Sequence, residues 1–516
     1  MNRSLAGISL VALGAGSALS AQSAPPSTSS AAVNRAAATI TAADVKRRIF
    51  VIAHDSMGGR DTPSAGLTKT ANYIASEFKR FGLKPAGDSG SYLMHYPIAR
   101  RQLLADRSSV SFGSAAADRS ISTTLAQGAA LIFGPTEAVA RGQVVLVGGA
   151  LVADSIKPED VQGRIVVLVP GPAGLTRASF PVLERLGAAG AAAVAVVVSS
   201  DSVFAGYARR QGSPQTVVAR GGRIPIVAVL ERGITGPVPE AADQFDQLRG
   251  APVPVVQPMP DWSGEIVLRD TTLSLRHAPN VVGIVEGSDP VLRKEYLVFS
   301  AHMDHIGTAG LPGASCRARA ADSICNGADD DGSGTVGVVE LAEAFSRPGA
   351  RPKRSAIFLT VSGEEHGLWG SDWFVNNPPV PVAQMVANFN ADMIGRNWKD
   401  TIVVIGKEHS DLGATLARVN AAHPELGMAA VDDRWPEESF YTRSDHYNFA
   451  IKGIPILFFF NGVHPDYHRA TDSPDKIDAE KESRVLRLMF YLGQEVGNAP
   501  ERPKWKPESY KQIVSP

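Results

Sequence analysis

Candidate metal ligands occur in five successive polar segments in the second half of the chain, four of which follow an apolar run and one of which follows a polar loop and leads into a helix. They are His302 and Asp304; Asp329, Asp330 and Asp331; Glu364 and Glu365; Asp392; and His464 and His468. A single residue of this kind is usually a helix cap or a solvated loop residue, but five occurrences in succession indicate a shared role. Imidazole and carboxylate groups without thiolates suit zinc better than cobalt, manganese or iron. There are enough candidates for two ions that share a bridging carboxylate.

The adjacent glutamates Glu364 and Glu365 lie in the segment TVSGEEHG, directly after an apolar run at 356–359. Two like charges at the end of a buried strand are costly unless something cationic offsets them. At a two-metal centre, one carboxylate can bind metal while its neighbour takes a proton from water, whose pKa the metals lower. The pair therefore predicts a metal ligand beside a general base.

Apolar strands alternate with helices around these residues. The predicted strands and helix are EYLVFSAHMD (295–304), GTVGVVELAEAF (334–345, the helix), SAIFLTVSGEE (355–365), QMVANFNAD (384–392) and GIPILFFFNG (453–462). This pattern predicts an α/β fold with a mainly parallel mixed sheet and helices on both faces. In such folds the site lies beyond the carboxyl ends of the strands, where the candidate ligands occur. Nearer the N-terminus, apolar residues at 4,3,4,3 spacing predict a helix over 67–81 that ends at Gly82.

The region 135–262 has a different texture. Short valine-rich strands alternate with glycines, with one predicted helix at Phe180–Ala188, and the region has no histidine and no cluster of acids. We interpret it as a small β-rich structural domain. The length of 516 residues also favours two or more domains.

Composition excludes some partners and suggests export. With 51 Lys and Arg against 52 Asp and Glu, nothing favours nucleic acid or an anionic membrane surface as a partner. Residues 1–21 have one basic residue, a short apolar stretch and small residues, which is typical of a secretory signal peptide; a retained anchor is the alternative. Export to the periplasm or medium, without a membrane span in the mature chain, is therefore expected. Residues 22–40 are expected to be a flexible lead-in.

The two cysteines, Cys316 and Cys325, flank the segment RARAADSI. In an exported chain they are expected to form a local disulfide, and two free thiols are the alternative. Their spacing does not fit a thiolate zinc site.

Six ordered motifs resemble peptidase family M28, in its bacterial aminopeptidase branch. They are AHMDHIG, NGADDDGSGT, SGEEHGLWGS, NFNADMIG, SDHYNFAIKGIPILFFF and HPDYHRATDSPDKID, spanning about 300–480. The start SMGGRDTPSAGLTKTANYIASEFKRFGLKPAG is also similar to the family. The resemblance implies a zinc exopeptidase fold in two parts, 41–134 and 263–500, followed by a tail at 501–516. Region 135–262 resembles a protease-associated (PA) domain.

The resemblance implies roles by position. His302 and Asp392 would hold one zinc ion, Glu365 and His468 the other, and Asp330 would bridge them. Glu364 would be the general acid/base, and Tyr467 would stabilise the oxyanion by a hydrogen bond. Asp304 would accept the second ring N–H of His302 and orient it.

Some alternatives remain open at this point. Asp329 or Asp331 could be the bridge, if the loop register differs by one. His305, His366 and His464 have no metal role in the motif, and Asp445 is a candidate for lining the cleft. The side-chain pocket is expected to involve Trp369, Phe440 and Tyr441.

The implied function is removal of N-terminal residues from peptide substrates. Carboxypeptidase or dipeptidase activity, and glutaminyl cyclase activity, are alternatives within the same fold. A catalytically inactive binding protein is the alternative of a different class, but none of the expected ligands is missing.

Overall fold

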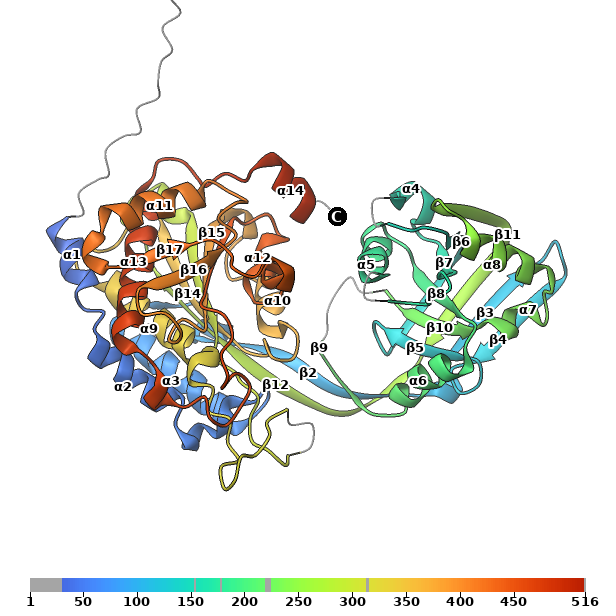
Figure 1. Ribbon diagram of the computed structural model, residues 1–516, viewed down its shortest axis with the longest axis horizontal. Coiled ribbons are helices and arrows are strands. Elements are labelled where there is room, and N and C mark those ends of the chain that lie inside the picture. Colours follow the sequence, from blue (N-terminus) through green and yellow to red (C-terminus); the bar gives the residue numbers. More distant parts are fainter. Residues whose placement is uncertain (1–29, 153–154, 177–178, 219–223, 312–314, 515–516) are drawn as a thin grey trace, which may run out of the picture.

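The protein folds into two lobes, each built around its own β-sheet (Figure 1). The computed structural model describes residues 30–152, 155–176, 179–218, 224–311 and 315–514, so the predicted signal segment 1–21 lies outside them. Two long antiparallel strands, β2 (Leu93–Leu103) and β12 (Asp270–Val285), run from one lobe toward the other. Among the described residues, no helix combines the length and apolar character needed to cross a membrane.

The sheet of the larger lobe is parallel at its centre. Its strand order is β17-β16-β18-β15-β13-β14-β12-β2-β9, with β1 (Lys84–Pro85) also paired to β12. The central strands are β14 (Ser355–Val361), β13 (Tyr296–His302), β15 (Met385–Asp392) and β18 (Ile456–Phe460), and all are parallel. The outer strands are β16 (Thr401–Ile405), β17 (Ala429–Val431), β12, β2 and β9 (Gln215–Val218). The predicted parallel strands are confirmed, but the antiparallel extension through β12 and β2 had no equally clear sequence signal.

Helices cover both faces of this sheet, as predicted. Alternate residues of β13 point to opposite sides, so Leu297 and Phe299 join one apolar core and Val298 joins another. The first core is completed by α2 (Ala42–Ile52), α3 (Ala65–Phe81), α9 (Gly334–Ser346), α11 (Leu412–Ala422) and α13 (Ala479–Asn498). The second core includes α10 (Trp369–Asn376) and α12 (His446–Ala450). Helix α3 ends where Gly82 adopts a φ of 75°, which confirms the predicted stop.

A buried ionic cluster joins three of these helices. Arg48 on α2 is fully buried and pairs with Glu77 on α3 and with Glu340 and Glu343 on α9. A buried charge is tolerated only when it is paired, so the guanidinium makes the packing of α2, α3 and α9 interdependent.

The lead-in predicted for 22–40 is not wholly flexible. Residues Ala31–Ala37 form helix α1, capped by the Ser30 side chain, and Ala36 and Ala37 are buried in the first core. The segment is rich in alanine, which has the highest helix propensity, and its small side chains fit closely against the core. The flexible lead-in was predicted from the small polar residues that precede this helix.

The smaller lobe contains an eight-stranded sheet in the order β4-β3-β11-β6-β7-β8-β10-β5. The strands are β3 (Ser109–Ser114), β4 (Arg119–Thr124), β5 (Ala129–Phe133), β6 (Ala138–Gly148), β7 (Ile165–Leu168), β8 (Ala193–Val198), β10 (Ile226–Leu230) and β11 (Val255–Leu268). The lobe therefore begins with β3 and not at residue 135, because β3 pairs with β11 of the same sheet. Its first strands lack the valine runs that marked the rest of the region.

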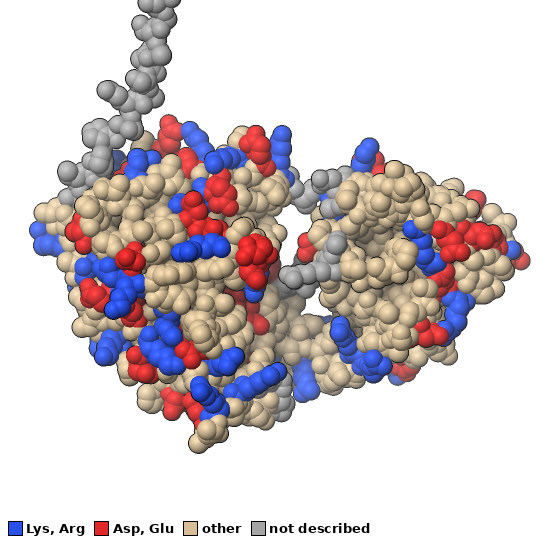
Figure 2. All heavy atoms as spheres, viewed as in Figure 1, with Lys and Arg blue, Asp and Glu red and all other residues tan. Residues whose placement is uncertain are grey.

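The smaller lobe also contains more helix than a β-rich reading implies. The helices are α4 (Pro158–Val161), α5 (Phe180–Ala188), α6 (Asp201–Gln211), α7 (Glu231–Thr235) and α8 (Glu240–Gly250). Apolar residues of α5 and α8 enter two different cores, on opposite faces of the sheet. Acidic and basic side chains are interspersed over the face seen in Figure 2, in keeping with the balanced net charge.

Candidate metal centre

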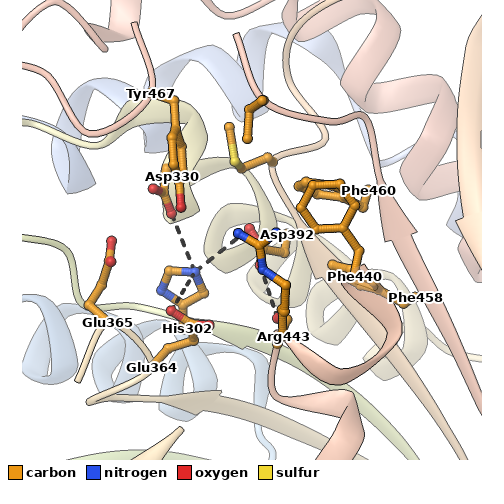
Figure 3. Close-up of a pocket in the computed structure, with 13 residues that line it drawn as sticks. His302, Asp330, Glu364, Glu365, Asp392, Phe440, Arg443, Phe458, Phe460 and Tyr467 are labelled. Carbon is orange, nitrogen blue, oxygen red and sulfur yellow. Dashed lines mark hydrogen bonds and ion pairs between the residues drawn. The ribbon is translucent and has the colours of Figure 1, made fainter. Parts of the chain in front are cut away.

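The ends of the central parallel strands bring the predicted ligands together (Figure 3). His302 and Asp392 are the last residues of β13 and β15, and Glu364 and Glu365 follow β14. Asp330 lies in the turn before α9, and His468 lies in the loop after β18. Residues separated by more than 160 positions thus meet at one edge of the sheet, as parallel strands require.

The side chains form two groups of ligand atoms that share one carboxylate. In the first group, Nε2 of His302 lies 3.4 Å from Oδ1 of Asp330 and 3.7 Å from Oδ1 of Asp392. In the second group, Nε2 of His468 lies 3.2 Å from Oδ2 of Asp330 and 3.0 Å from Oε2 of Glu365. Each oxygen of Asp330 therefore faces a different histidine.

His305 also belongs to the second group, although sequence reasoning gave it no metal role. Its Nδ1 lies 2.8 Å from Oε1 of Glu365 and 3.6 Å from Oδ2 of Asp330, and the ring is fully buried. His305, Asp330 and Glu365 present ligand atoms close enough to surround one ion, as do His302, Asp330 and Asp392. The sequence feature that could have identified His305 as a ligand candidate is its position three residues after His302.

The three consecutive aspartates have different surroundings. The carboxylate of Asp331 accepts hydrogen bonds from the backbone N–H groups of His302, Gly334 and Met393. Asp329 accepts from the N–H of Gly395 and contacts Nε2 of His464. Of the three carboxylates, only that of Asp330 faces the first and second groups.

A further aspartate, Asp472, holds the turn in place. Its Oδ2 accepts hydrogen bonds from the backbone N–H groups of Asp329 and Asp330, at 3.0 and 3.1 Å. Sequence reasoning missed this role, although Asp472 lies within the last of the six motifs.

Asp304 contacts His302 differently from the expectation. Nδ1 of His302 is 3.2 Å from the backbone carbonyl oxygen of Asp304, whereas the Asp304 carboxylate is 3.7 Å away. That carboxylate instead accepts hydrogen bonds from the hydroxyl of Thr62 and the N–H of Glu364. The carbonyl orients the histidine, and the side chain fixes the backbone that carries Glu364.

Other candidates lie near the cluster but outside the two groups. His464 contacts Asp329, and His366 contacts Asp61 at 2.9 Å. Asp445 is fully buried and is not among the residues that line the pocket beside the cluster. Burial raises the pKa of Asp445 to about 7, and the charge of His302 opposes that rise.

Negative charge dominates the electrostatics of the cluster. Burial would lower the pKa of His302, but the carboxylates of Glu364 and Asp392 raise it well above its usual value. Burial likewise would lower the pKa of His468, yet Asp330 and Glu365 raise it to about 10. Burial raises the pKa of Glu364 well above its usual value; His302 opposes this, and Glu365 adds to it. Burial would raise the pKa of Glu365, but hydrogen bonds from His305 and His468 lower it well below its usual value. The two histidines and Glu364 therefore favour their protonated forms, and a bound cation would displace those protons.

The donor set fits metal ions. Oδ2 of Asp330, Oδ1 of Asp392 and Nε2 of His468 are buried polar atoms without a hydrogen-bond partner. Unpaired buried polar atoms are rare because they forfeit the hydration they had in water. Imidazole and carboxylate donors without thiolate suit zinc, and these orphaned atoms converge on the two groups.

The ligand candidates all fall within a segment of the chain that matches a known protein family. Residues 280–493 match the model of Peptidase family M28.

These residues form an M28 peptidase domain.

The match confirms the predicted M28 family and the general class of this domain, a peptidase, whereas the aminopeptidase branch stays a prediction. Leupeptin-inactivating enzyme 1 of Streptomyces exfoliatus is 32% identical over 158 residues, which are 30% of this chain and 34% of that protein. A vacuolar membrane protease of Verticillium alfalfae is 29% identical over 160 residues, which are 30% of this chain and 15% of that protein. The chain thus spans about a third or less of these two relatives. The aminopeptidase from Aneurinibacillus sp. strain AM-1 has 17% identity and a TM-score of 0.46, covering 92% of this chain and 98% of its own.

An apolar wall stands beside the ligand groups of the M28 domain. The pocket contains Phe440, Phe458, Phe460, Met393 and Val463, together with Arg443 and the predicted Tyr467. Phe440 was expected here, but Trp369 lines a different cleft and Tyr441 lies behind the wall, where its ring contacts the buried His446. The ring of Tyr467 stacks on His468 with centroids 3.9 Å apart. Burial and the nearby carboxylates raise the pKa of Tyr467, so its hydroxyl keeps its proton.

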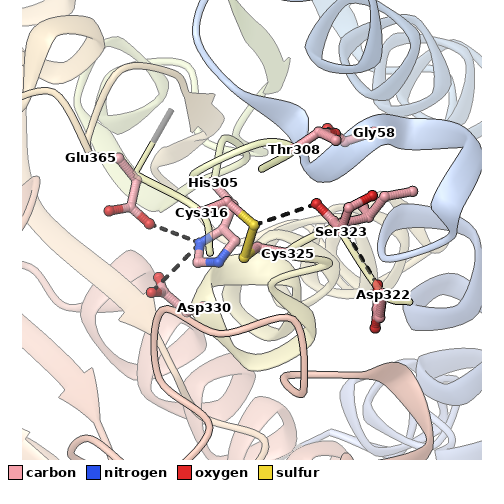
Figure 4. The surroundings of a disulfide bond; sticks show 10 residues. Gly58, His305, Thr308, Cys316, Asp322, Ser323, Cys325, Asp330 and Glu365 are labelled. Atoms are coloured by element: carbon pink, nitrogen blue, oxygen red, sulfur yellow. Dashed lines mark hydrogen bonds and ion pairs between the residues drawn. A yellow bond between two sulfur atoms is a disulfide. The ribbon is translucent and has the colours of Figure 1, made fainter. Parts of the chain in front are cut away.

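The loop of the M28 domain that carries the cysteines lies against the second group (Figure 4). Cys316 and Cys325 form a disulfide. They pack with Ile306 and Ala470, which are near neighbours in sequence of His305 and His468. The disulfide therefore lies under the two segments that carry these histidines.

Proposed function

We propose that this chain is a two-zinc aminopeptidase that removes the N-terminal residue of peptides. The observation that carries the proposal is the pair of ligand groups that share Asp330, with Glu364 beside them. His302 and Asp392 would hold one ion, His468 and Glu365 the other, and Asp330 would bridge them. The ions would supply Lewis acidity, which polarises a carbonyl group and lowers the pKa of water.

The remaining work falls to the side chains of this chain. Glu364, whose backbone N–H is fixed by the Asp304 carboxylate, takes the proton from the attacking water and passes it to the leaving amine. The protonated hydroxyl of Tyr467 donates a hydrogen bond to the oxygen that gains negative charge. His305 does not face the reaction in this proposal; it positions the Glu365 carboxylate through a 2.8 Å contact.

The apolar wall supports a preference for apolar N-terminal side chains. Phe440, Phe458 and Phe460 lie within the same pocket as His302 and Asp392. A side chain placed there would leave water for an aromatic surface, which is favourable in proportion to the apolar area buried.

The first experiment is hydrolysis of an aminoacyl-anilide panel by the zinc-loaded protein, with each substrate in free-amine and N-acetylated form. Cleavage of the free-amine forms alone, with leucyl and phenylalanyl substrates preferred, supports the proposal. Cleavage of C-terminal residues from N-blocked peptides would favour a carboxypeptidase, and cyclisation of glutaminyl peptides would favour a glutaminyl cyclase.

The variant E364Q separates catalysis from metal binding. Loss of general acid/base catalysis should lower kcat by about 10²–10⁴-fold, while the zinc content stays that of the parent. D330N is the matched variant, because it should lower both kcat and zinc content. Parent-like activity in E364Q would exclude the role proposed for Glu364, and parent-like zinc content in D330N would exclude the bridge.

Export and the nature of the smaller lobe stay predictions. N-terminal sequencing of protein recovered from outside the cytoplasm should find that residues 1 to about 21 have been removed. Recovery of the intact N-terminus there would favour the retained anchor.

A further inference from the structure

Strand β9 is placed unusually. In sequence it lies between β8 and β10 of the smaller lobe, yet it pairs with β2 and forms the edge of the larger sheet. The pairing is antiparallel and runs from Ile98 opposite Val218 to Arg101 opposite Gln215. Among the residues that the structure describes, no strand pairs with the other edge of β9. A free strand edge is a template for another extended chain.

A cleft of about 500 Å³ adjoins this edge and extends over the neighbouring strands β2 and β12, which contribute Pro97, Ala99, Arg101 and Leu275. All four residues of β9 line it. The smaller lobe contributes residues 131–137, at the end of β5, and the larger lobe contributes His366 and Trp369. Residues of both lobes therefore line the cleft. Strand β9, which also lines it, lies within the smaller lobe in sequence but pairs with the sheet of the larger lobe.

The cleft adjoins the segment that carries the ligand candidate Glu365. His366 directly follows the ligand candidate Glu365, and its ring stacks on Trp369 with centroids 4.9 Å apart. Two exposed apolar side chains also line the cleft: Phe133 is 46% exposed and Leu275 is 59% exposed.

We propose that the part of a substrate on the C-terminal side of the scissile bond binds in this cleft as an extended strand paired with β9. The inference rests on the proposed aminopeptidase function and specifies its substrates as unfolded peptides of several residues. Main-chain hydrogen bonds to β9 would supply affinity without regard to sequence. Alternate side chains of the peptide would face Trp369 and Phe133, because successive residues of a strand point to opposite sides.

A length series tests the reach of the cleft. Peptides of two to ten residues with one fixed N-terminal residue should show kcat/KM rising with length and then levelling off once the chain spans β9. The aminoacyl-anilide, which has no peptide backbone beyond the scissile bond to pair with β9, is the reference. A kcat/KM that does not change with length overturns the proposal.

N-methylation of the substrate tests strand pairing directly. In the ten-residue peptide, methylation of a backbone nitrogen that donates to β9 should lower kcat/KM by about three- to tenfold, the usual weight of one hydrogen bond. In an antiparallel or parallel pair only alternate residues point their N–H toward one neighbour, so sensitive and insensitive positions should alternate. Losses at every position, or at none, contradict pairing with β9.

The variant F133A, with V203A as its control, tests the wall of the smaller lobe. Val203 is 50% exposed on α6 and does not line the cleft. F133A should raise KM for the ten-residue peptide by several-fold and leave anilide hydrolysis unchanged, whereas V203A should change neither. Equal KM values for parent and F133A would exclude this wall.

Binding separates failure of this inference from failure of the proposed function. The E364Q protein should bind a fluorescently labelled ten-residue peptide, measured by anisotropy, and F133A/E364Q should bind it several-fold more weakly. If no free-amine substrate is cleaved, the proposed function fails, and this binding difference still decides the assignment of the cleft. Equal binding by both proteins would overturn it.

Discussion

The buried His446 should make the stability of the protein depend on pH. Its ring is fully buried, stacks on Phe458 with centroids 4.2 Å apart, and places Nε2 2.8 Å from the carbonyl oxygen of Tyr441. Burial lowers the pKa of His446 to about 3, and the contact with Tyr441 offsets this only partly. The imidazole is therefore neutral in the folded protein at any pH used for assay.

The sign and size of the effect follow from linkage. In the unfolded chain His446 has a pKa of about 6.5, so below that pH the unfolded state binds a proton that the folded state does not. The contribution to stability is full above pH 6.5 and is lost as the pH falls toward 3. For one group with these two pKa values, the loss is about 1.4 kcal/mol at pH 5.5 and about 2 kcal/mol at pH 5.0.

The measurement is urea unfolding of the parent and H446F at pH 7.5 and pH 5.5. Phenylalanine keeps the stack on Phe458 but does not titrate. Loss of the hydrogen bond to the Tyr441 carbonyl changes the free energy of unfolding by the same amount at both pH values. On going from pH 7.5 to 5.5 the parent should lose about 1.4 kcal/mol more than H446F. H277F is the control, because His277 is exposed and its ring is in water in both states. An equal pH dependence in parent and H446F would refute the reasoning.

Three other predictions concern the core, the second ligand group and the disulfide. R48M should lower the free energy of unfolding by about 3–5 kcal/mol because it strands buried carboxylates, and R48M/E340L should recover part of the loss in urea unfolding. H305A should weaken zinc binding by about 10–100-fold in competition with a chelator, whereas H366A, whose ring contacts Asp61, should not; equal effects would remove the special role of His305. C316S/C325S should lower the free energy of unfolding by about 2–3 kcal/mol, as expected for a short closed loop, and an unchanged urea midpoint would contradict this.

The sequence predicted the centre of the larger lobe well because each signal there is local. A continuous apolar run such as 356–359 identifies a buried strand, and a polar residue after it identifies the strand end. Since parallel strands end at one edge, the convergence of His302, Asp392 and Glu365 followed from topology. None of these steps needed knowledge of a contact between distant side chains.

The features that sequence reasoning missed depend on such contacts. The pairing of β9 with β2 joins residues more than 100 positions apart, and nothing in the segment QTVV indicates which lobe it enters. The role of Asp304 depended on whether its carbonyl or its carboxylate faced His302, which the sequence cannot distinguish. The burial of α1 likewise required a surface of the first core on which its alanines could pack.

The three consecutive aspartates have different roles, so a shift of one residue would place the wrong carboxylate between the two ligand groups. Asp331 binds three backbone N–H groups from the ends of β13 and β15 and the start of α9, so it ties together the segments that carry His302 and Asp392. Asp329 does the same for the segment after β15 and for His464. A carboxylate that already accepts backbone hydrogen bonds has fewer lone pairs left for a cation, whereas Asp330 has both oxygens directed at histidines. The three aspartates are therefore identical in type but not in role. Asp329 and Asp331 hold the backbone segments around the site in place, and the position of the Asp330 carboxylate depends on them.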